Sequence, residues 1–539
     1  MVERYDLEEV EVHGKSTVRN RTNQSNLSED YDRTELANLG KKQVLKRRFG
    51  FMSMIGFSCT LMATWAGMLT YFVGPLTNGG FAGSVYGFIF SWFGVLTVMC
   101  SLSELASMAP TAGGQYHYVA MLAPSNCQRI LSYIAGWATV TAWQATVSAV
   151  CLPLATIVQG MVIMNNPNYH PERWHATLMA YAFILLALFV NTYLNKYFAK
   201  IEGMILILYI LGFLGVVISL SALSEHIPAE VVFKSWNNGG GWDSITLAWF
   251  VSLASFAGAF AGADGATHMA EEIHNASLVV PQSMVTSVVI NGVFGFAALM
   301  AILFSITDLD SALASPTGYP FMAVFQSAGG VRGGTVMTCT IVCLGTFGSW
   351  ALLATASRQV WAFSRDNGMP GSRFLSRIEP NSALPVYAIA LTISVNFLIP
   401  LIYIGSPVGF YAVISLLVSS FYISFILPIT LLLWRRLTGS IKMPVPGAES
   451  GFKNTPGSRR LVWGPWRMPA IVGIVVNTIA VAFAAVILAF SCFPPVAIVD
   501  KTTMNYSSVV SGGVMVFAIV YYFVKARKTY QGPTIEIDE

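Results

Sequence analysis

The chain has 539 residues, of which 54% are hydrophobic and only 11% are charged, and its mean hydropathy is +0.59. Soluble domains carry about 25% charged residues, so this composition excludes a soluble protein and indicates a chain embedded in the lipid bilayer. The net charge of +4 is not gathered into a basic patch interleaved with aromatic residues, which excludes nucleic acid as a partner.

The N-terminal residues 1–45 are polar and contain few large apolar side chains. Such a segment cannot bury enough apolar surface to fold alone, so we predict a disordered cytoplasmic tail. It has no early apolar core of a cleavable signal peptide, so the first membrane span must act as the targeting signal. A basic collar precedes that span and contains Lys41, Lys42, Lys46, Arg47 and Arg48.

Twelve segments are predicted to span the membrane, because crossing the hydrocarbon core takes about 20 apolar residues. The sixth begins near Trp249. The others cover approximately residues 49–73, 83–108, 129–161, 174–193, 203–222, 284–306, 335–357, 385–403, 408–434, 468–492 and 508–525.

The distribution of positive charge predicts the orientation of the chain. Of 31 Lys and Arg residues, only Arg173, Lys234, Arg332 and Lys501 fall in loops on the side opposite the N-terminus. Because Lys and Arg accumulate in cytoplasmic loops, we predict that both termini are cytoplasmic. The plasma membrane is the expected location, with the vacuole as the alternative.

The sixth span carries the clearest sign of function. Its sequence, WFVSLASFAGAFAGADGATHMAEE at 249–272, becomes rich in Gly and Ala and then reaches Asp264. A carboxylate at this depth costs about 2.5–3.5 kcal/mol on the insertion scale. An unbroken helix that faces lipid would gain nothing from such a carboxylate. A helix that breaks at its glycines exposes backbone groups to a solute in a protein-lined cavity. The alternative is that Gly and Ala only permit close helix packing.

The first span is interrupted in a similar way, by small and hydroxylated residues between Gly56 and Gly67. These hydroxyls can satisfy backbone groups that local unwinding frees, although they can also bond back to the preceding helical turn. Matching interruptions in two halves are the best sequence indication of a binding site between inverted repeats. Spans one and six stand an odd number of spans apart, so the two halves are inserted in opposite orientations.

Three motifs resemble the amino acid–polyamine–organocation superfamily, and within it the fungal amino acid, choline and GABA permeases. They are PTAGGQY at 110–116, FAGAD at 260–264 with the downstream Glu271, Glu272 and Pro281, and RQVWAFSRDNGMP at 358–370. The resemblance implies an all-α integral membrane fold with twelve helices, in which a leucine-transporter-like 5+5 inverted repeat is followed by two further helices. It also implies alternating access driven by protons.

The implied segments are a first repeat at 46–223, a second repeat at 244–435, a cytoplasmic loop at 436–467, two helices at 468–525 and a cytoplasmic tail at 526–539. Two departures from the family pattern stand out. Span one lacks the Gly-Ser-Gly of many members, and the position of a proton-linked lysine in span five of some bacterial relatives holds Tyr209. The proton site is therefore not located by the resemblance.

Two chemistries are open for the substrate. A quaternary ammonium such as choline binds aromatic faces, each worth about 0.5–2 kcal/mol. An amino acid instead offers its carboxylate to freed N–H groups and its ammonium to freed C=O groups. The candidate substrate-binding residues for both are Gly56, Ser58, Thr60, Ala63, Trp65, Trp137, Phe256, Gly258, Phe260, Gly262 and Trp350. In the family motif, Phe260 caps the substrate and Asp264 helps to couple the gates.

Four further residues are candidates for coupling or gating: Asp264, His268, Glu271 and Glu104. Asp264 can balance a cationic substrate or carry a proton. His268 and Glu271 share a helix face, which favours an inner-gate contact, with Arg358 or Lys200 as partner, over a metal site. Glu104 ends span two, where a gate and a structural ion pair are equally open. No metal and no cofactor is expected.

The sequence therefore favours a secondary transporter of a small amine, an amino acid or a choline-like solute, with H⁺ as the coupling ion. The alternatives are a transporter for a specialised amine or alkaloid metabolite, a nutrient sensor on a transporter scaffold, and a channel. An enzyme is not expected, because the chain has neither a His-Glu-x-x-His nor a Gly-x-Ser-x-Gly motif.

Overall fold

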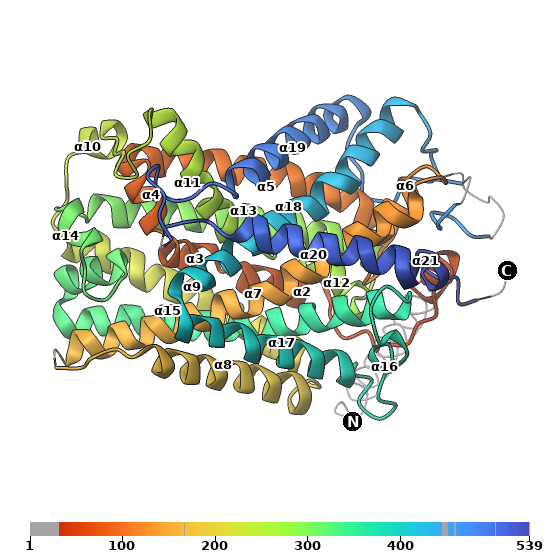
Figure 1. Ribbon diagram of the computed structural model, residues 1–539, viewed down its shortest axis with the longest axis horizontal. Coiled ribbons are helices and arrows are strands. Elements are labelled where there is room, and N and C mark those ends of the chain that lie inside the picture. The colour runs from red at the N-terminus through yellow and green to blue at the C-terminus, as the bar shows by residue number, and fades with distance from the viewer. Residues whose placement is uncertain (1–31, 167, 445–450, 458–459, 502, 538–539) are drawn as a thin grey trace, which may run out of the picture.

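The computed structural model describes residues 32–537, apart from 167, 445–450, 458–459 and 502. Its long helices run along one direction, and the first and last described segments of the chain lie together at one end of the bundle (Figure 1). We call this end the terminal end, and the opposite one, which carries α4, α10 and α14, the far end.

Within the described residues, 11 helical segments are long and apolar enough to cross a membrane. The twelfth predicted crossing is the shorter apolar helix α11 (Ile245–Ala259), which ends where the sixth span breaks. The first crossing consists of α2 (Phe51–Met62), α3 (Thr64–Thr70) and α4 (Val73–Thr77). The remaining crossings are α5 (Gly80–Met108), α7 (Gln128–Asn165), α8 (Arg173–Tyr193), α9 (Phe198–Leu223), α13 (Ala276–Phe304), α15 (Pro320–Arg365), α17 (Val386–Gly405), α18 (Pro407–Leu437), α19 (Ala470–Phe490) and α20 (Ser507–Tyr521).

Short helices fill the connections between the crossings, except for the last two named here, which continue α20. They are α6 (Gln115–Leu122), α10 (Ala229–Lys234), α12 (Gly265–His268), η1 (Ala270–Glu272), α14 (Leu309–Leu313), α16 (Ser372–Leu375), η2 (Tyr522–Ala526) and α21 (Arg527–Thr529). Two predicted boundaries are wrong. The seventh span begins at Ala276 and contains Pro281, and the eighth runs over the whole of α15, across a non-helical glycine at Gly330 with φ of 65°.

The packing of the helices agrees with two inverted halves. The second crossing, α5, packs against the seventh, α13, and the third, α7, packs against the eighth, α15. The broken first and sixth crossings run in opposite directions, since α2 starts at the terminal end whereas α11 starts at the far end (Figure 1). The last two crossings lie outside this core, with α19 and α20 both packed on α18.

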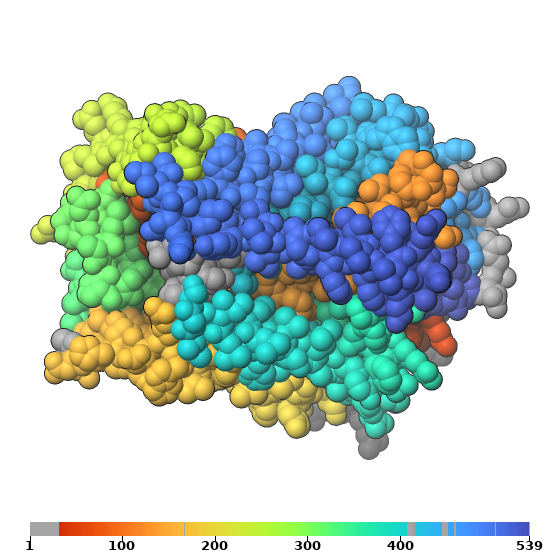
Figure 2. All heavy atoms as spheres, in the orientation of Figure 1, coloured from red at the N-terminus to blue at the C-terminus, as the bar shows by residue number. Residues whose placement is uncertain are grey.

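The outer surface suits a lipid environment. In the space-filling view, α20 lies across the face of the bundle (Figure 2). Large apolar side chains on the outermost helices are exposed, and a broad apolar surface of this kind marks a membrane-facing protein. Examples are Leu178, Leu185, Phe189, Ile207, Leu211, Ile218, Ile471, Val475, Val516 and Val520.

The predicted disorder of residues 1–45 is wrong for the part that the structure describes, and residues 1–31 lie outside it. Residues 32–38 are helical, and Leu36, Leu39 and Leu45 are buried. The tail is polar on average, so its composition did not reveal this short segment, whose leucines are buried at the terminal end of the bundle. The C-terminal segment docks beside it, because the N–H of Glu536 donates to the carbonyl of Gly40 at 2.7 Å, and Tyr530 is fully buried against Tyr133.

Candidate functional site

The first crossing breaks at Ala63, inside the stretch that the sequence singled out. Ala63 has φ 40° and ψ 45°, a left-handed conformation that ends α2 and starts α3. The N–H of Thr64 donates to Asn291 Oδ1 on α13 at 2.9 Å, and the amide of Asn291 donates to the carbonyl of Cys59 at 3.4 Å. The asparagine oxygen thus replaces the helical acceptor of Thr64, as a buried backbone N–H requires, whereas the carbonyl of Cys59 keeps its helical donor, the N–H of Ala63, at 2.8 Å.

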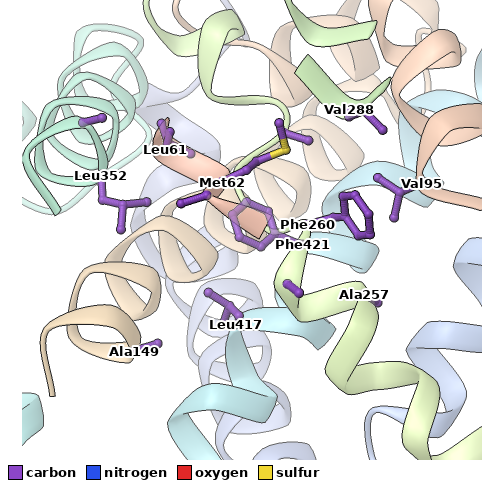
Figure 3. Packing of buried hydrophobic residues seen from close by; sticks show 14 of the residues in the cluster. Leu61, Met62, Val95, Ala149, Ala257, Phe260, Val288, Leu352, Leu417 and Phe421 are labelled. Carbon is purple, nitrogen blue, oxygen red and sulfur yellow. The ribbon is translucent and has the colours of Figure 1, made fainter. Parts of the chain in front are cut away.

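The sixth crossing breaks between Ala259 and Gly265, as predicted. The chain leaves the helix at Phe260 and turns at Gly262, whose φ of 91° lies in the left-handed region where glycine is favoured. A side chain at Gly262 would meet Leu61 of the first break, because an added Cβ would lie 2.1 Å from its Cδ2 atom. The two breaks therefore face each other. Figure 3 shows Leu61 and Met62 of the first crossing and Phe260 of the sixth among the buried apolar side chains between the helices.

A cavity of about 70 Å³ lies at the breaks. It runs from Thr60 and Ala63 along α3 to Tyr71, toward the far end, and its other walls come from α7, α11, α15 and α18. Among the described residues that line it, none carries a charge and Tyr71 supplies the single aromatic ring. Polar recognition of a solute here must come from backbone groups and hydroxyls.

Three predicted substrate-binding residues, Thr60, Ala63 and Gly258, line this cavity, and Gly262 shapes the facing turn. Phe260 instead borders a smaller neighbouring cavity that it shares with Phe421. Thr60 and Gly258 lie within two turns of the breaks, which is why the sequence pattern located them.

The structure does not bring the other candidates to the cavity. An added Cβ at Gly56 would lie 2.7 Å from the carbonyl of Glu202, so this glycine serves close packing of α2 on α9. Ser58 is buried, and its hydroxyl has no hydrogen-bond partner. The four remaining aromatic residues pack within the helix bundle, and each contacts another ring: Trp65 with Tyr209, Phe256 with Phe88, Trp137 with Phe517 and Trp350 with Phe347. Hence no aromatic cage for a quaternary ammonium is formed by them.

Asp264 and His268 lie on the terminal side of the sixth break and are fully buried. Asp264 Oδ2 accepts from Gln115 Nε2 at 2.6 Å and lies 3.4 Å from His268 Nε2. His268 Nδ1 lies 3.1 Å from the carbonyl oxygen of Ala112. Both residues thereby connect the sixth crossing to the PTAGGQY segment. The sequence identified this segment as a motif, but it did not predict these contacts.

The next layer toward the terminal end consists of buried ion pairs. Glu271 accepts two hydrogen bonds from Arg365, at 2.7 and 2.9 Å, and Glu272 accepts from Arg358 Nε at 2.8 Å. Burial raises the pKa of Glu271, but the charge and hydrogen bonds of Arg365 outweigh it, so the pKa lies below its ordinary value. The predicted partners Arg358 and Lys200 were wrong for Glu271, because the two adjacent acids divide two arginines of α15 between them.

A third layer joins both ends of the chain and was missed by the sequence analysis. Lys41 Nζ lies 2.5 Å from Asp366 Oδ1, and the backbone N–H of Thr534 donates to the same oxygen at 2.9 Å. Tyr116 donates to the other oxygen of Asp366 at 2.7 Å. Lys41 was read as part of a basic collar, because a contact between residues so distant in sequence leaves no local pattern.

Glu104 belongs to a different contact. Its Oε1 atom lies 2.5 Å from Arg436 Nη2 and accepts the backbone N–H of Met468 at 2.8 Å. These bonds tie the end of α5 to the end of α18 and to the segment before α19. Of the two possibilities that the sequence left open, the geometry agrees with a structural ion pair.

Comparison with known proteins agrees with this architecture. The amino acid permease family matches residues 49–518. A protein of Macrophomina phaseolina named as a candidate amino acid/polyamine transporter is 32% identical over 464 residues, which cover 85% of this chain and 97% of that protein. The choline transporter of Saccharomyces cerevisiae is 30% identical over 489 residues, covering 90% and 83%. The amino-acid permease BAT1 of Arabidopsis thaliana is 27% identical over 529 residues, covering 94% and 97%. The resemblance seen in the motifs is confirmed, and the chain belongs to the amino acid permease family.

Proposed function

We propose that this chain is a permease that moves a small ammonium-bearing solute, an amino acid or an amine, by alternating access. The observation that carries the proposal is that the carboxyl ends of α2 and α11 both lie at one uncharged cavity. The carboxyl end of a helix carries a partial negative charge, and two such ends meeting at one point favour a cation.

Freed carbonyl groups support this choice. In a continuous helix, the carbonyls of Thr60 and Met62 would accept from the N–H groups of Thr64 and Ala66. Here Thr64 donates to Asn291 and Ala66 donates to the carbonyl of Ala63. The carbonyls of Thr60 and Met62 are thereby left to meet an ammonium group. With only one aromatic ring in the lining, a primary amine fits this chemistry better than a quaternary one.

The arrangement of gates supports alternating access. The cavity extends toward the far end, whereas three buried polar layers, at Asp264, Glu271 and Asp366, separate it from the terminal end. Since Lys and Arg concentrate at the terminal end, that end is cytoplasmic in our proposal, in the plasma membrane. The solute enters from outside, and transport requires the three layers to separate, with a proton as the coupling ion.

The relatives named above are described as transporters of amino acids, polyamines or choline, so uptake of these classes is the test. Radiolabelled choline, GABA, an acidic, a neutral and a basic amino acid, and a polyamine would be offered to transport-deficient yeast that expresses the chain, over a range of external pH. We expect saturable uptake of at least one primary amine that rises as external pH falls. Uptake no greater than that of the empty vector for every solute, with the protein at the cell surface, would refute the proposal.

A further inference from the structure

A buried carboxyl group on α9 has no role in the site described so far. Glu202 is 0% exposed and lies in the first turns of a membrane-spanning helix. Its Oε2 atom lies 2.9 Å from the hydroxyl oxygen of Thr60, and its Oε1 atom has no hydrogen-bond partner. An ionisable residue inside a membrane span is costly, and it commonly marks an ion or proton pathway.

The hydrogen-bond geometry favours the neutral form of Glu202. Thr60 has one hydroxyl hydrogen, and the carbonyl oxygen of Gly56 is also 2.9 Å from its Oγ1 atom. If Glu202 carries a proton on Oε2, it donates to Thr60, and Thr60 donates to Gly56, so both hydroxyl hydrogens have an acceptor. If Glu202 is ionised, Thr60 must turn away from Gly56, and the buried charge has a single hydroxyl as its partner.

No cation neutralises Glu202 among the described residues, since none of their ion pairs includes it. The helices packed against α9 are α2, α13 and α15. The buried titratable group of α2 is Cys59, α13 has no titratable side chain, and Arg358 of α15 pairs with Glu272. On α9 itself, Lys200 is exposed and two residues away, where helical side chains do not face each other. The remaining titratable groups on these helices are Tyr209, which donates to Asn291, and Arg332, Cys339, Cys343 and Arg365 of α15. Arg48, in the segment before α2, donates to the carbonyl of Asn195.

Access to Glu202 differs on its two sides. Thr60 also lines the solute cavity, so this residue stands between the carboxyl group and the cavity. On the terminal side lie three buried rings, Phe49, Phe57 and Phe198, with centroids 5.8 to 6.2 Å apart. Phe57 and Phe198 each lie about one helical turn before Thr60 and Glu202, on the same helix faces. The rings therefore separate Glu202 from the terminal end.

We propose that Glu202 is the proton-binding site of the transport cycle, loaded from the solute cavity through Thr60 and sealed from the terminal end by Phe49, Phe57 and Phe198. In each cycle a proton from the external side binds the carboxylate, and the same proton leaves to the cytoplasm when the first crossing tilts and the rings part. This assignment rests on the proposed function and adds to it the place where the coupling ion binds.

The test begins with a measurement that needs no substrate. The infrared difference spectrum between the wild type and Glu202→Gln is recorded on full-length protein in lipid nanodiscs at neutral pH, with Glu230→Gln as the matched control. Glu230 lies on α10, where its side chain is exposed and pairs with Lys234. We expect Glu202→Gln to remove a band of a neutral carboxyl group, and Glu230→Gln to remove bands of an ionised one. Loss of ionised carboxylate bands from Glu202→Gln would overturn the proposal.

The second measurement uses proteoliposomes with labelled choline and labelled GABA as separate probes. Glu202→Gln should lose accumulation driven by a pH gradient but keep the exchange of labelled for unlabelled solute, whereas Glu230→Gln should match the wild type. Thr60→Val keeps the carboxyl group and should slow gradient-driven accumulation while shifting the neutral carboxyl band. Normal accumulation by Glu202→Gln would contradict the assignment. If the wild type moves neither probe, these probes count against the proposed function, and the infrared spectrum still decides the state of Glu202.

Discussion

The side chain of Asn291 holds the first break open by accepting the N–H of Thr64 at 2.9 Å. Tyr209 donates to the same oxygen at 2.8 Å, so the fifth crossing also supports the break. Tyr209 holds the position at which the resemblance implies a proton-linked lysine in some bacterial members of the superfamily. In this chain the position stabilises the break through an uncharged hydrogen bond.

We predict that Asn291→Leu destabilises the protein by about 1–3 kcal/mol, because it leaves the buried N–H of Thr64 without an acceptor. The thermal unfolding temperature of the purified protein should fall, and uptake should fall with it. Asn165→Leu is the control, since Asn165 is exposed at the end of α7. Equal unfolding temperatures for the wild type and Asn291→Leu would show that the asparagine does not support the break.

The turn in the sixth crossing provides a second prediction, from a matched pair of glycines. Gly262→Ala should be destabilising, because a left-handed backbone costs a non-glycine residue about 1–2 kcal/mol and the new Cβ would clash with Leu61. At Gly258 an added Cβ would meet Val418 at 3.5 Å, an ordinary contact. Thermal unfolding and uptake should therefore be impaired for Gly262→Ala, and unfolding should be unchanged for Gly258→Ala. The opposite order would contradict the geometry of the turn.

The ion pairs at the terminal end predict a pH dependence of stability. Burial raises the pKa of Asp366, but Lys41 and Arg365 outweigh it, so its pKa, like that of Glu271, lies below the ordinary value. A carboxyl group with a lowered pKa stabilises the fold above its unfolded pKa, about 4 for Asp and Glu, and this stability is lost as pH falls through the folded pKa.

The unfolding temperature should therefore stay constant between pH 5 and 8, where Glu271 and Asp366 remain ionised, and should drop in more acidic buffer.

Arg365→Ala should reduce the free energy of unfolding by about 3–5 kcal/mol at pH 7, because it leaves Glu271 charged, buried and unpaired. Adding Glu271→Gln to Arg365→Ala should recover part of this loss. A double variant no more stable than Arg365→Ala would argue against the pairing.

Asp264 is the residue through which we expect the cavity and the gate to communicate. Asp264→Asn keeps the size of the side chain but replaces the carboxyl group that faces Gln115 and His268. We predict loss of accumulation with unchanged abundance at the cell surface, measured by uptake and surface labelling in parallel. Normal accumulation by this variant would refute a coupling role.

Much of the fold could be predicted because its signals are local. Long apolar runs mark the crossings, and the small residues around Ala63 and Gly262 mark the breaks, since each break is determined by its own few residues. The residues that hold the breaks in place are different. Asn291 and Glu202 contact the first break from other crossings, and a single polar residue in an apolar helix gives no sign of its partner.

The aromatic candidates show the same limit. Trp65 and Trp137 could be assigned to the cavity by composition, but an aromatic residue in a membrane helix is equally suited to packing between helices. Only the three-dimensional arrangement shows that Trp65 faces Tyr209 and Trp137 faces Phe517. The docking of Lys41 onto Asp366 was unpredictable for a related reason, as it depends on how the whole bundle brings the two ends of the chain together.

The most direct test that the two breaks form the solute site is the uptake of a transported solute by Gly258→Trp, which fills the cavity between them. Gly512→Trp is its control, because Gly512 is exposed on α20 and an added Cβ meets nothing there. If the breaks form the solute site, Gly258→Trp abolishes uptake at normal surface abundance and Gly512→Trp does not. Uptake by Gly258→Trp with unchanged KM and maximal rate would show that the solute does not bind between the breaks.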